Sequence, residues 1–171
     1  MRVLAVFLLL LPMAHRLDEY LQTSRLSLAL DRIVLRIDLT PGVEVAPLIF
    51  ATINTNRDGE ISEGEGTAYA NQLLKDIVLD VDGRRQPLTV VSSQFPSFRE
   101  MSSGLGVIRI EAQAAWTGTP GQHSLVYENK HKPDLGVYLV NALIPANPKI
   151  AITAQNRDPL QREFRLAFKI D

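Results

Sequence analysis

Six residues between Asn54 and Glu65 carry oxygen atoms at the spacing that a bound calcium ion requires. With Asn54 as the first position of a twelve-residue loop, the other oxygen donors fall at the third, fifth, seventh, ninth and twelfth positions: Asn56, Asp58, Glu60, Ser62 and Glu65. Glu60 would contribute its backbone carbonyl, and Gly59 at the sixth position would allow the sharp turn. This is the pattern of an EF-hand loop, so the sequence predicts a calcium site formed by these six residues.

The predicted site holds few charges, and this weakens it. Asn54 stands where the pattern calls for aspartate, so Asp58 and Glu65 are the side chains that would bring carboxylates to the ion. Affinity depends on the number of charged ligands, and we therefore expect a dissociation constant of roughly 10⁻⁴ to 10⁻³ M, the range of extracellular calcium modules.

The same residues allow a second interpretation, without a metal. Ser62 and Glu65 have the spacing of a helix capping box, and clusters of asparagine, aspartate and glycine form turns by themselves. A plain turn does not require oxygen-bearing side chains at Asn54, Asn56 and Asp58, at every second position before the glycine. We therefore favour an EF-hand origin, and the missing carboxylate raises the separate question of how much calcium the loop holds.

Apolar residues at helical spacing lie on both sides of the loop. Those before it predict a short helix, and those after it recur at the i, i+3, i+4, i+7 spacing of an amphipathic helix. The two sets are Val45, Leu48, Ile49 and Ile53, and Ala70, Leu73, Leu74 and Ile77. The loop therefore has the two flanking helices that an EF-hand requires.

The rest of the chain predicts short strands. Residues 26–39 alternate apolar and polar side chains around a turn at 30–32, and Asp82-Gly83 is a hairpin signal between two further alternating runs. Other strand candidates are 106–116, 123–129, 137–144, 149–155 and 163–170. Roughly nine short strands favour a mainly β protein, an antiparallel β-sandwich of the immunoglobulin-like type. The EF-hand helix–loop–helix would be inserted at about residues 44–77.

Residues 1–14 have the pattern of a secretory signal peptide. Arg2 precedes an unbroken apolar run over residues 3–11, and Ala14 suits the last position before a cleavage site. The alternative is a buried first strand or helix of the domain. The run is about half of the ~20 residues that a bilayer requires, so we expect no membrane span in the mature chain. We predict one periplasmic or secreted domain over residues 15–171.

Composition excludes several classes of function. The 171 residues, 46% of them hydrophobic, suit one domain with its own core. Eighteen basic and nineteen acidic residues give a net charge of -1, which argues against nucleic acid as a partner. The absence of cysteine excludes disulfides and thiolate chemistry. No nucleophile elbow, phosphate loop or zinc signature is present, so we expect no enzyme.

The three histidines offer a second kind of metal chemistry. Cleavage after Ala14 would make His15 the first residue, and its free amine and imidazole could chelate copper or nickel, with a second histidine completing the site. His123 and His131 flank residues 124–130 and suit ordinary surface or turn positions equally well. The alternative function is therefore a periplasmic protein that binds or delivers copper or nickel through His15.

Several segments resemble a group of bacterial secreted proteins described as EF-hand domain-containing. Besides the calcium loop, the resemblance rests on AHRLDEYLQ, LTPGV, GLGVIRIE, YLVNALIP and ITAQNRDP. The first of these also resembles the extracytoplasmic N-terminal region of HupE/UreJ-type membrane proteins, which are accessory to hydrogenase and urease. The resemblance implies the calcium loop, matched here at Asn56, Asp58, Glu60, Ser62 and Glu65.

HupE/UreJ-type proteins are associated with nickel or cobalt permeation through a membrane bundle. This chain has no apolar stretch long enough for such a bundle, so transport does not carry over. Residues and resemblance together predict an extracytoplasmic calcium-binding module with a structural or interaction role. An envelope or membrane protein would be its partner.

Overall fold

The computed structural model describes residues 18–171, which form a mainly β structure of two five-stranded sheets and three short helices. The predicted signal peptide (residues 1–14) and His15 lie outside the described residues. The first sheet has the spatial order β5 (Thr89–Gln94), β6 (Ile108–Ala115), β2 (Arg32–Pro41), β1 (Tyr20–Leu28) and β8 (Gly136–Ala142). The second has the order β4 (Arg84–Arg85), β3 (Ile77–Val81), β7 (Gly121–Asn129), β10 (Glu163–Ile170) and β9 (Ile150–Arg157).

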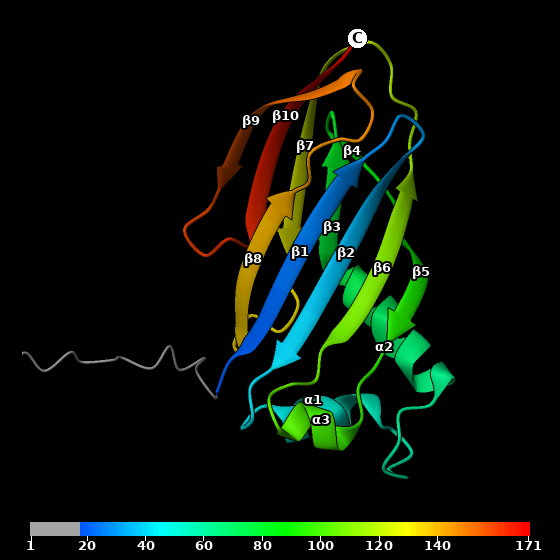
Figure 1. The fold of residues 1–171 in the computed structure, drawn as a ribbon, viewed down its shortest axis with the longest axis vertical. Helices are drawn as coiled ribbons and strands as arrows, with labels where there is room; N and C mark the ends of the chain where they lie inside the picture. Colours follow the sequence, from blue (N-terminus) through cyan, green and yellow to red (C-terminus); the bar gives the residue numbers. More distant parts are fainter. Residues whose placement is uncertain (1–17) are drawn as a thin grey trace, which may run out of the picture.

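Figure 1 shows the two sheets as two layers, with the helices gathered toward one end. They are α1 (Ala46–Ile53), α2 (Glu63–Lys75) and α3 (Phe98–Ser102). Helices α1 and α3 lie together at that end, and α2 packs beside β5. A single cluster of buried apolar residues joins both sheets to α1 and α2. None of the helices in the described part of the chain is long and apolar enough to cross a bilayer.

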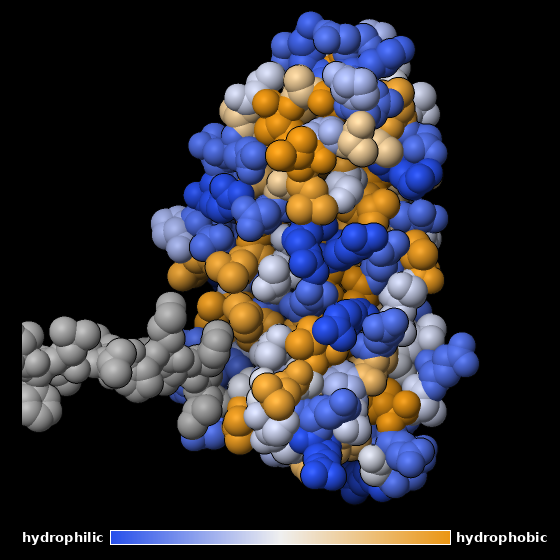
Figure 2. Space-filling model, in the orientation of Figure 1, coloured by the Kyte–Doolittle hydropathy of each residue, from blue (hydrophilic) through white to orange (hydrophobic). Residues whose placement is uncertain are grey.

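Apolar and polar side chains alternate along β1 and β2, and this pattern explains why the hairpin between them forms. Leu35, Ile37 and Leu39 of β2 are fully buried and are separated by residues that face outward. The predicted hairpin over residues 26–39 is confirmed, because Leu26 pairs with Leu35 and Leu28 with Ile33 in antiparallel register. Burying one face of each strand removes its apolar side chains from water while the other face stays polar. Figure 2 shows one face of the molecule, on which hydrophilic side chains surround separate apolar patches.

The two predicted helices beside the loop are confirmed, and their sequences explain their ends. Pro47 lies in the first turn of α1, where its missing N–H costs nothing. Helix α2 begins after Ser62, which forms a capping box with Glu65, and Lys75 lies in its last turn. Ile77 is not part of α2 as predicted but opens β3.

Three features of the sheets differ from the sequence prediction. Strand β8 pairs with β1 in parallel register, whereas an antiparallel sandwich was expected. The turn at Asp82-Gly83 joins β3 to β4, a strand of only two residues. Strand β5, which follows β4, pairs instead with β6 in the first sheet. Pro87, which has no N–H to donate, lies between β4 and β5, where the chain leaves the second sheet.

Helix α3 was not predicted, although its start carries a local signal. Ser97 accepts a hydrogen bond from the backbone N–H of Glu100, and the Glu100 carboxylate accepts one from the backbone N–H of Ser97. This is a second capping box, with the same spacing as Ser62 and Glu65. The five-residue helix is too short to show a helical apolar period, so the cap was the available signal.

Candidate functional site

The loop predicted to bind calcium joins α1 to α2 directly. Helix α1 ends at Ile53, Asn54 is its C-terminal cap, and α2 begins at Glu63, so Glu65 lies in the first turn of the second helix. The backbone of Arg57 has φ +61° and that of Gly59 has φ +93°, which turn the chain sharply on either side of Asp58. Glycine adopts such a conformation without the steric cost that a side chain adds.

The Glu65 carboxylate closes the loop by bonding to both of its ends. One oxygen accepts hydrogen bonds from the backbone N–H groups of Thr55 (2.7 Å) and Asn56 (3.1 Å) and from the Thr55 hydroxyl. The other accepts from the backbone N–H (3.0 Å) and hydroxyl (2.8 Å) of Ser62. The hydrogen bonds from the Ser62 backbone, and then from Asn56, lower the pKa of Glu65 to about 2. The carboxylate is therefore ionised at neutral pH and stabilises the loop.

Asn54 differs from the other predicted ligands because it is buried. The residue is 4% exposed, and its side-chain oxygen Oδ1 has no hydrogen-bond partner among the described residues. A buried amide oxygen without a donor costs about 1–3 kcal/mol. The first position of the loop therefore holds an oxygen whose bonding capacity is unused.

The remaining predicted ligands lie close together on the exposed turn. Asn56 donates from its side-chain amide to Asp58 Oδ2 (2.9 Å) and accepts from the Asp58 backbone N–H (3.0 Å). Asp58 Oδ1 in turn accepts from the backbone N–H of Glu60 (2.9 Å). The structure thus brings Asn56 to Asp58 and Ser62 to Glu65. Among the described residues, no group of three or more His, Cys, Asp or Glu side chains could hold a metal ion.

A buried polar cluster that the sequence did not predict lies farther along α2. The Tyr69 hydroxyl lies 2.8 Å from the Tyr20 hydroxyl and 3.0 Å from Nε2 of His131. Nδ1 of His131 lies 2.8 Å from Oδ2 of Asp76, the residue that caps the C-terminus of α2. No motif links these four residues, which come from three separate segments of the chain: β1, helix α2 with its C-terminal cap, and the segment after β7.

The backbone of His131 is held as firmly as its ring. Its N–H donates to the side chain of Asn129 (2.9 Å). Its carbonyl accepts from the Gln22 amide and from the Tyr138 hydroxyl, both at 2.8 Å. The Asn129 amide also donates to the side-chain oxygen of Gln22 (3.0 Å), so each of these two buried side chains fixes the position of the other. A satisfied polar network of this kind specifies one arrangement of the elements it joins.

Burial sets the protonation states of this cluster. It lowers the pKa of His131, although the hydrogen bond that the ring donates to Asp76 acts in the opposite direction. It also raises the pKa of Tyr69 to about 12. Both groups are therefore neutral at pH 7. Since Asp76 is an acceptor, His131 donates from Nδ1, and its Nε2 accepts the hydrogen bond from Tyr69.

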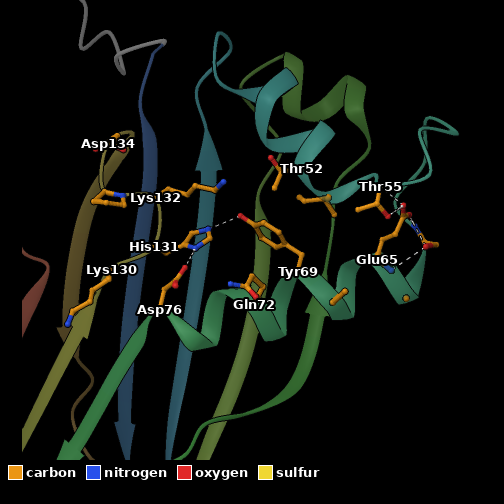
Figure 3. A pocket seen from close by; sticks show the side chains of 15 residues that line it. Thr52, Thr55, Glu65, Tyr69, Gln72, Asp76, Lys130, His131, Lys132 and Asp134 are labelled. Carbon is orange, nitrogen blue, oxygen red and sulfur yellow. Dashed lines mark hydrogen bonds and ion pairs between the residues drawn. The ribbon is translucent and has the colours of Figure 1, made fainter.

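A cavity of about 900 Å³ connects the loop to the buried cluster. Its lining includes Glu65, Tyr69, Gln72 and Asp76, which recur on one face of α2 and extend over about 16 Å of helix. Figure 3 shows His131 between Tyr69 and Asp76, with Lys132 extending across the cavity. The loop and the cluster therefore share one hollow surface, and α2 connects them.

The two described histidines bear on the copper or nickel alternative. Both ring nitrogens of His131 are engaged, as are those of His123, which lie 2.7 Å from Asp82 Oδ2 and 2.7 Å from the Thr119 carbonyl. A metal ion at either ring would first have to displace one of these partners. The two rings also lie at opposite ends of β7, whose residues from His123 to Asn129 span about 20 Å.

Compared with known protein families, with curated proteins and with solved structures, the chain shows no match. The resemblance to EF-hand domain-containing and HupE/UreJ-type proteins therefore stays a prediction. The features on which a function can be argued are those of the structure itself: the two sheets, the loop between α1 and α2, and the buried cluster beside it.

Proposed function

We propose that this chain is an extracytoplasmic structural or interaction module that binds calcium weakly through the loop from Asn54 to Glu65. In this proposal the two sheets are an immunoglobulin-like β-sandwich, and α1, the loop and α2 are an inserted EF-hand. Side-chain oxygens of Asn54, Asn56, Asp58, Ser62 and Glu65 and the carbonyl of Glu60 would hold the ion.

One observation carries the proposal, namely the unpartnered Oδ1 of Asn54. A plain turn needs no oxygen in a position where it is shielded from water and receives no hydrogen bond. A calcium loop does need one there, because its first position supplies a ligand. Binding of a cation would remove the cost of this unpaired atom, which gives the ion a specific source of affinity.

The bonding of Glu65 explains why the affinity would be low. Its two oxygens already accept five hydrogen bonds from Thr55, Asn56 and Ser62. An ion would have to compete with those donors for the same lone pairs. With Asp58 as the second carboxylate, the charge count also stays low. Calcium at roughly millimolar concentration, as outside cells, would be needed to load the loop.

Calcium would act on the arrangement of the two helices. Helix α1 is joined to the loop at its first ligand and α2 at its last, so an ion would hold the end of one helix to the start of the other. The cavity beside α2 would change shape with that angle. An envelope protein bound at this surface would then respond to calcium.

Calorimetric titration of the purified chain with CaCl₂ and MgCl₂ tests the proposal. We expect a saturable calcium heat at roughly millimolar concentration. It should be lost in Asp58→Ala and in Glu65→Gln, which keeps the shape of the side chain but removes its charge. Glu128→Gln, on strand β7, is the matched control and should bind calcium as the parent does. Calcium heats that survive both loop substitutions, or their complete absence in the parent, would refute the assignment.

A further inference from the structure

The cavity between α2 and the segment after β7 contains opposite charges that the fold leaves uncompensated. Its volume of about 900 Å³ lies within the roughly 300–1,000 Å³ of typical ligand pockets. Away from the loop, the residues that bring formal charges to its lining are Asp76, Lys130, Lys132 and Asp134. The calcium proposal uses none of these four residues.

Asp76 keeps its negative charge although it is bonded to His131. Its Oδ2 lies 2.8 Å from Nδ1 of an imidazole that is neutral at pH 7, because burial lowers the pKa of His131. A neutral donor leaves the charge of the carboxylate in place, and Asp76 Oδ1 accepts no hydrogen bond from the described residues. Asp76 also caps the C-terminus of α2, the end of a helix that carries a partial negative charge. This part of the cavity therefore favours a cation.

The lysines that lie near Asp76 in the structure are bonded to other groups. Nζ of Lys75 lies 3.2 Å from the side-chain oxygen of Gln72, and Nζ of Lys130 lies 3.0 Å from a carboxylate oxygen of Glu128. Neither forms an ion pair with Asp76 in the part of the chain that the structure describes. The place for a cation beside Asp76 is therefore open.

Lys132 carries a positive charge on the other side of the same imidazole ring. Its amino group has no hydrogen-bond or ion-pair partner among residues 18–171. Burial is the main cause of the lowered pKa of His131, and the charge of Lys132 acts in the same direction, so that charge lies near the ring. Figure 3 shows Lys132 and Asp76 on opposite sides of His131, with Asp134 farther from the ring.

The backbone of Lys132 is strained at this position. Its φ of +49° lies in the left-handed region, which residues with a Cβ seldom adopt. The Lys132 carbonyl accepts hydrogen bonds from the backbone N–H groups of Leu135 (3.1 Å) and Gly136 (2.8 Å), which hold the turn. Strained backbone of this kind is concentrated at binding sites. It is a second observation, independent of charge, that distinguishes Lys132 from an ordinary surface lysine.

We propose that this cavity binds a small zwitterion, whose ammonium group pairs with Asp76 and whose carboxylate pairs with Lys132. Charge-assisted hydrogen bonds of both kinds are stronger than those between neutral groups. Ile53, Ala68 and Tyr69 give the cavity apolar surface for the rest of the ligand. Free amino acids and short peptides share this pair of charges. A molecule with a single charge would leave either Asp76 or Lys132 without a partner.

NMR titration of the ¹⁵N-labelled chain with L-leucine tests the proposal. Calcium-free buffer makes the result independent of the proposed calcium site. We expect saturable shifts of the Tyr69 and Lys132 amides. Isoamylamine, which is leucine without its carboxylate, and 4-methylpentanoate, which is leucine without its amine, should each bind more weakly by about tenfold or more.

Two substitutions remove one charge each. Asp76→Asn keeps an oxygen that accepts from His131, and Lys132→Met leaves the buried hydrogen bonds untouched, so a loss of binding in the second variant does not reflect unfolding. Each should weaken leucine binding by about tenfold or more. The control Lys169→Met removes a lysine of β10 that pairs with Asp171, and it should leave the affinity unchanged.

The peptide Leu-Gly-Gly distinguishes the two sources of the zwitterion. Tighter binding of Leu-Gly-Gly than of leucine would assign the site to peptides, and affinity no higher than that of leucine would assign it to free amino acids. Shifts that neither zwitterion produces, that do not saturate, that isoamylamine or 4-methylpentanoate reproduces at equal affinity, or that survive both substitutions would overturn the proposal.

Discussion

The hydroxyl groups of Tyr20 and Tyr69 lie 2.8 Å apart and join the first strand to helix α2. Tyr20 is fully buried and Tyr69 is 6% exposed, so neither hydroxyl has water as a ready alternative partner. Because Tyr69 donates to His131, its oxygen is left to accept the hydrogen bond from Tyr20. Helix α2, which begins at the loop from Asn54 to Glu65, is thus tied to the core through a chain of hydrogen bonds.

Substitution of Tyr69 by phenylalanine should destabilise the protein by about 1–3 kcal/mol, because it leaves buried polar groups of Tyr20 and His131 unpaired. Urea denaturation measures the loss. In a Tyr20→Phe background the same substitution should cost less free energy of unfolding, because the Tyr20 hydroxyl, one of the two groups that would lose a partner, is already absent. Equal losses in the two backgrounds would show that the tyrosines are not coupled.

The two described histidines should affect stability with opposite dependence on pH. His131 has a lowered pKa, mainly through burial, so its contribution is present above the unfolded value of about 6.5 and is lost as pH falls. His123 has a raised pKa, chiefly through its hydrogen bond to Asp82. Its contribution is complete below about pH 6.5 and is lost as pH rises through the folded value.

Single glutamine substitutions separate the two histidines. His123→Gln should reduce the free energy of unfolding more at about pH 5 than at about pH 8, and His131→Gln should reduce it more at about pH 8. Urea denaturation at both pH values provides the comparison. The same pH dependence in both variants would contradict the assigned protonation states.

Replacement of Asn54 by aspartate should make stability depend on calcium. Without the ion, a carboxylate at this buried helix C-terminus lacks a donor and should cost about 1–3 kcal/mol. With calcium, the added charge should restore the stability and tighten binding. Asn156→Asp, on the exposed part of β9, is the control. Thermal unfolding with and without CaCl₂ distinguishes the outcomes, and a calcium-independent loss in Asn54→Asp would count against the site.

Two glycines in the first turns of α2 should respond oppositely to alanine. A Cβ at Gly64 meets no atom within 4 Å, so Gly64→Ala should stabilise the helix by about 0.5–1 kcal/mol. A Cβ at Gly66 would lie 2.6 Å from Cε2 of Phe95, whose ring packs against Tyr69. Gly66→Ala should therefore cost about 1–3 kcal/mol. Chemical denaturation measures both, and a stabilising Gly66→Ala would mean that Phe95 moves freely.

Arg157 covers the open edge of the first sheet. Its guanidinium donates to the Val140 carbonyl and the Asn141 side chain of β8, both at 2.7 Å, and lies 4.8 Å above the ring of Phe164. The other edges are interrupted, because β4 has two residues and the pairings of β5 and β9 each contain a register shift. Exposed sheet edges promote pairing between molecules, and such features prevent it.

Substitution of Arg157 by alanine should therefore destabilise the fold by about 1–2 kcal/mol and promote self-association. Light scattering and size-exclusion chromatography would detect the associated species. Arg165→Ala on β10, which removes an exposed pair with Glu163, should remain unassociated. If Arg157→Ala associates no more than this control, the edge of β8 does not depend on Arg157 to prevent pairing between molecules.

Much of the local structure could be predicted because it depends on short spacings. The alternation of Leu35, Ile37 and Leu39 indicated a strand, and the period of Ala70 and Leu73 indicated a helix. The parallel pairing of β1 with β8 had no such local signal. Tyr20 and Gly136 are far apart in the sequence, and they pair only because the segments between them fold. The same holds for β5, whose apolar pattern suits either sheet.

By itself, the sequence predicted most of the strands, the two helices beside the loop, and which six residues of that loop carry oxygens at calcium spacing. Those properties follow from backbone periods of two and 3.6 residues and from turns a few residues long. Only the tertiary structure decided that Asn54 Oδ1 is buried without a donor and that His131 lies against Tyr69 and Asp76. Burial and long-range hydrogen bonding depend on how whole faces pack together, which no local spacing specifies.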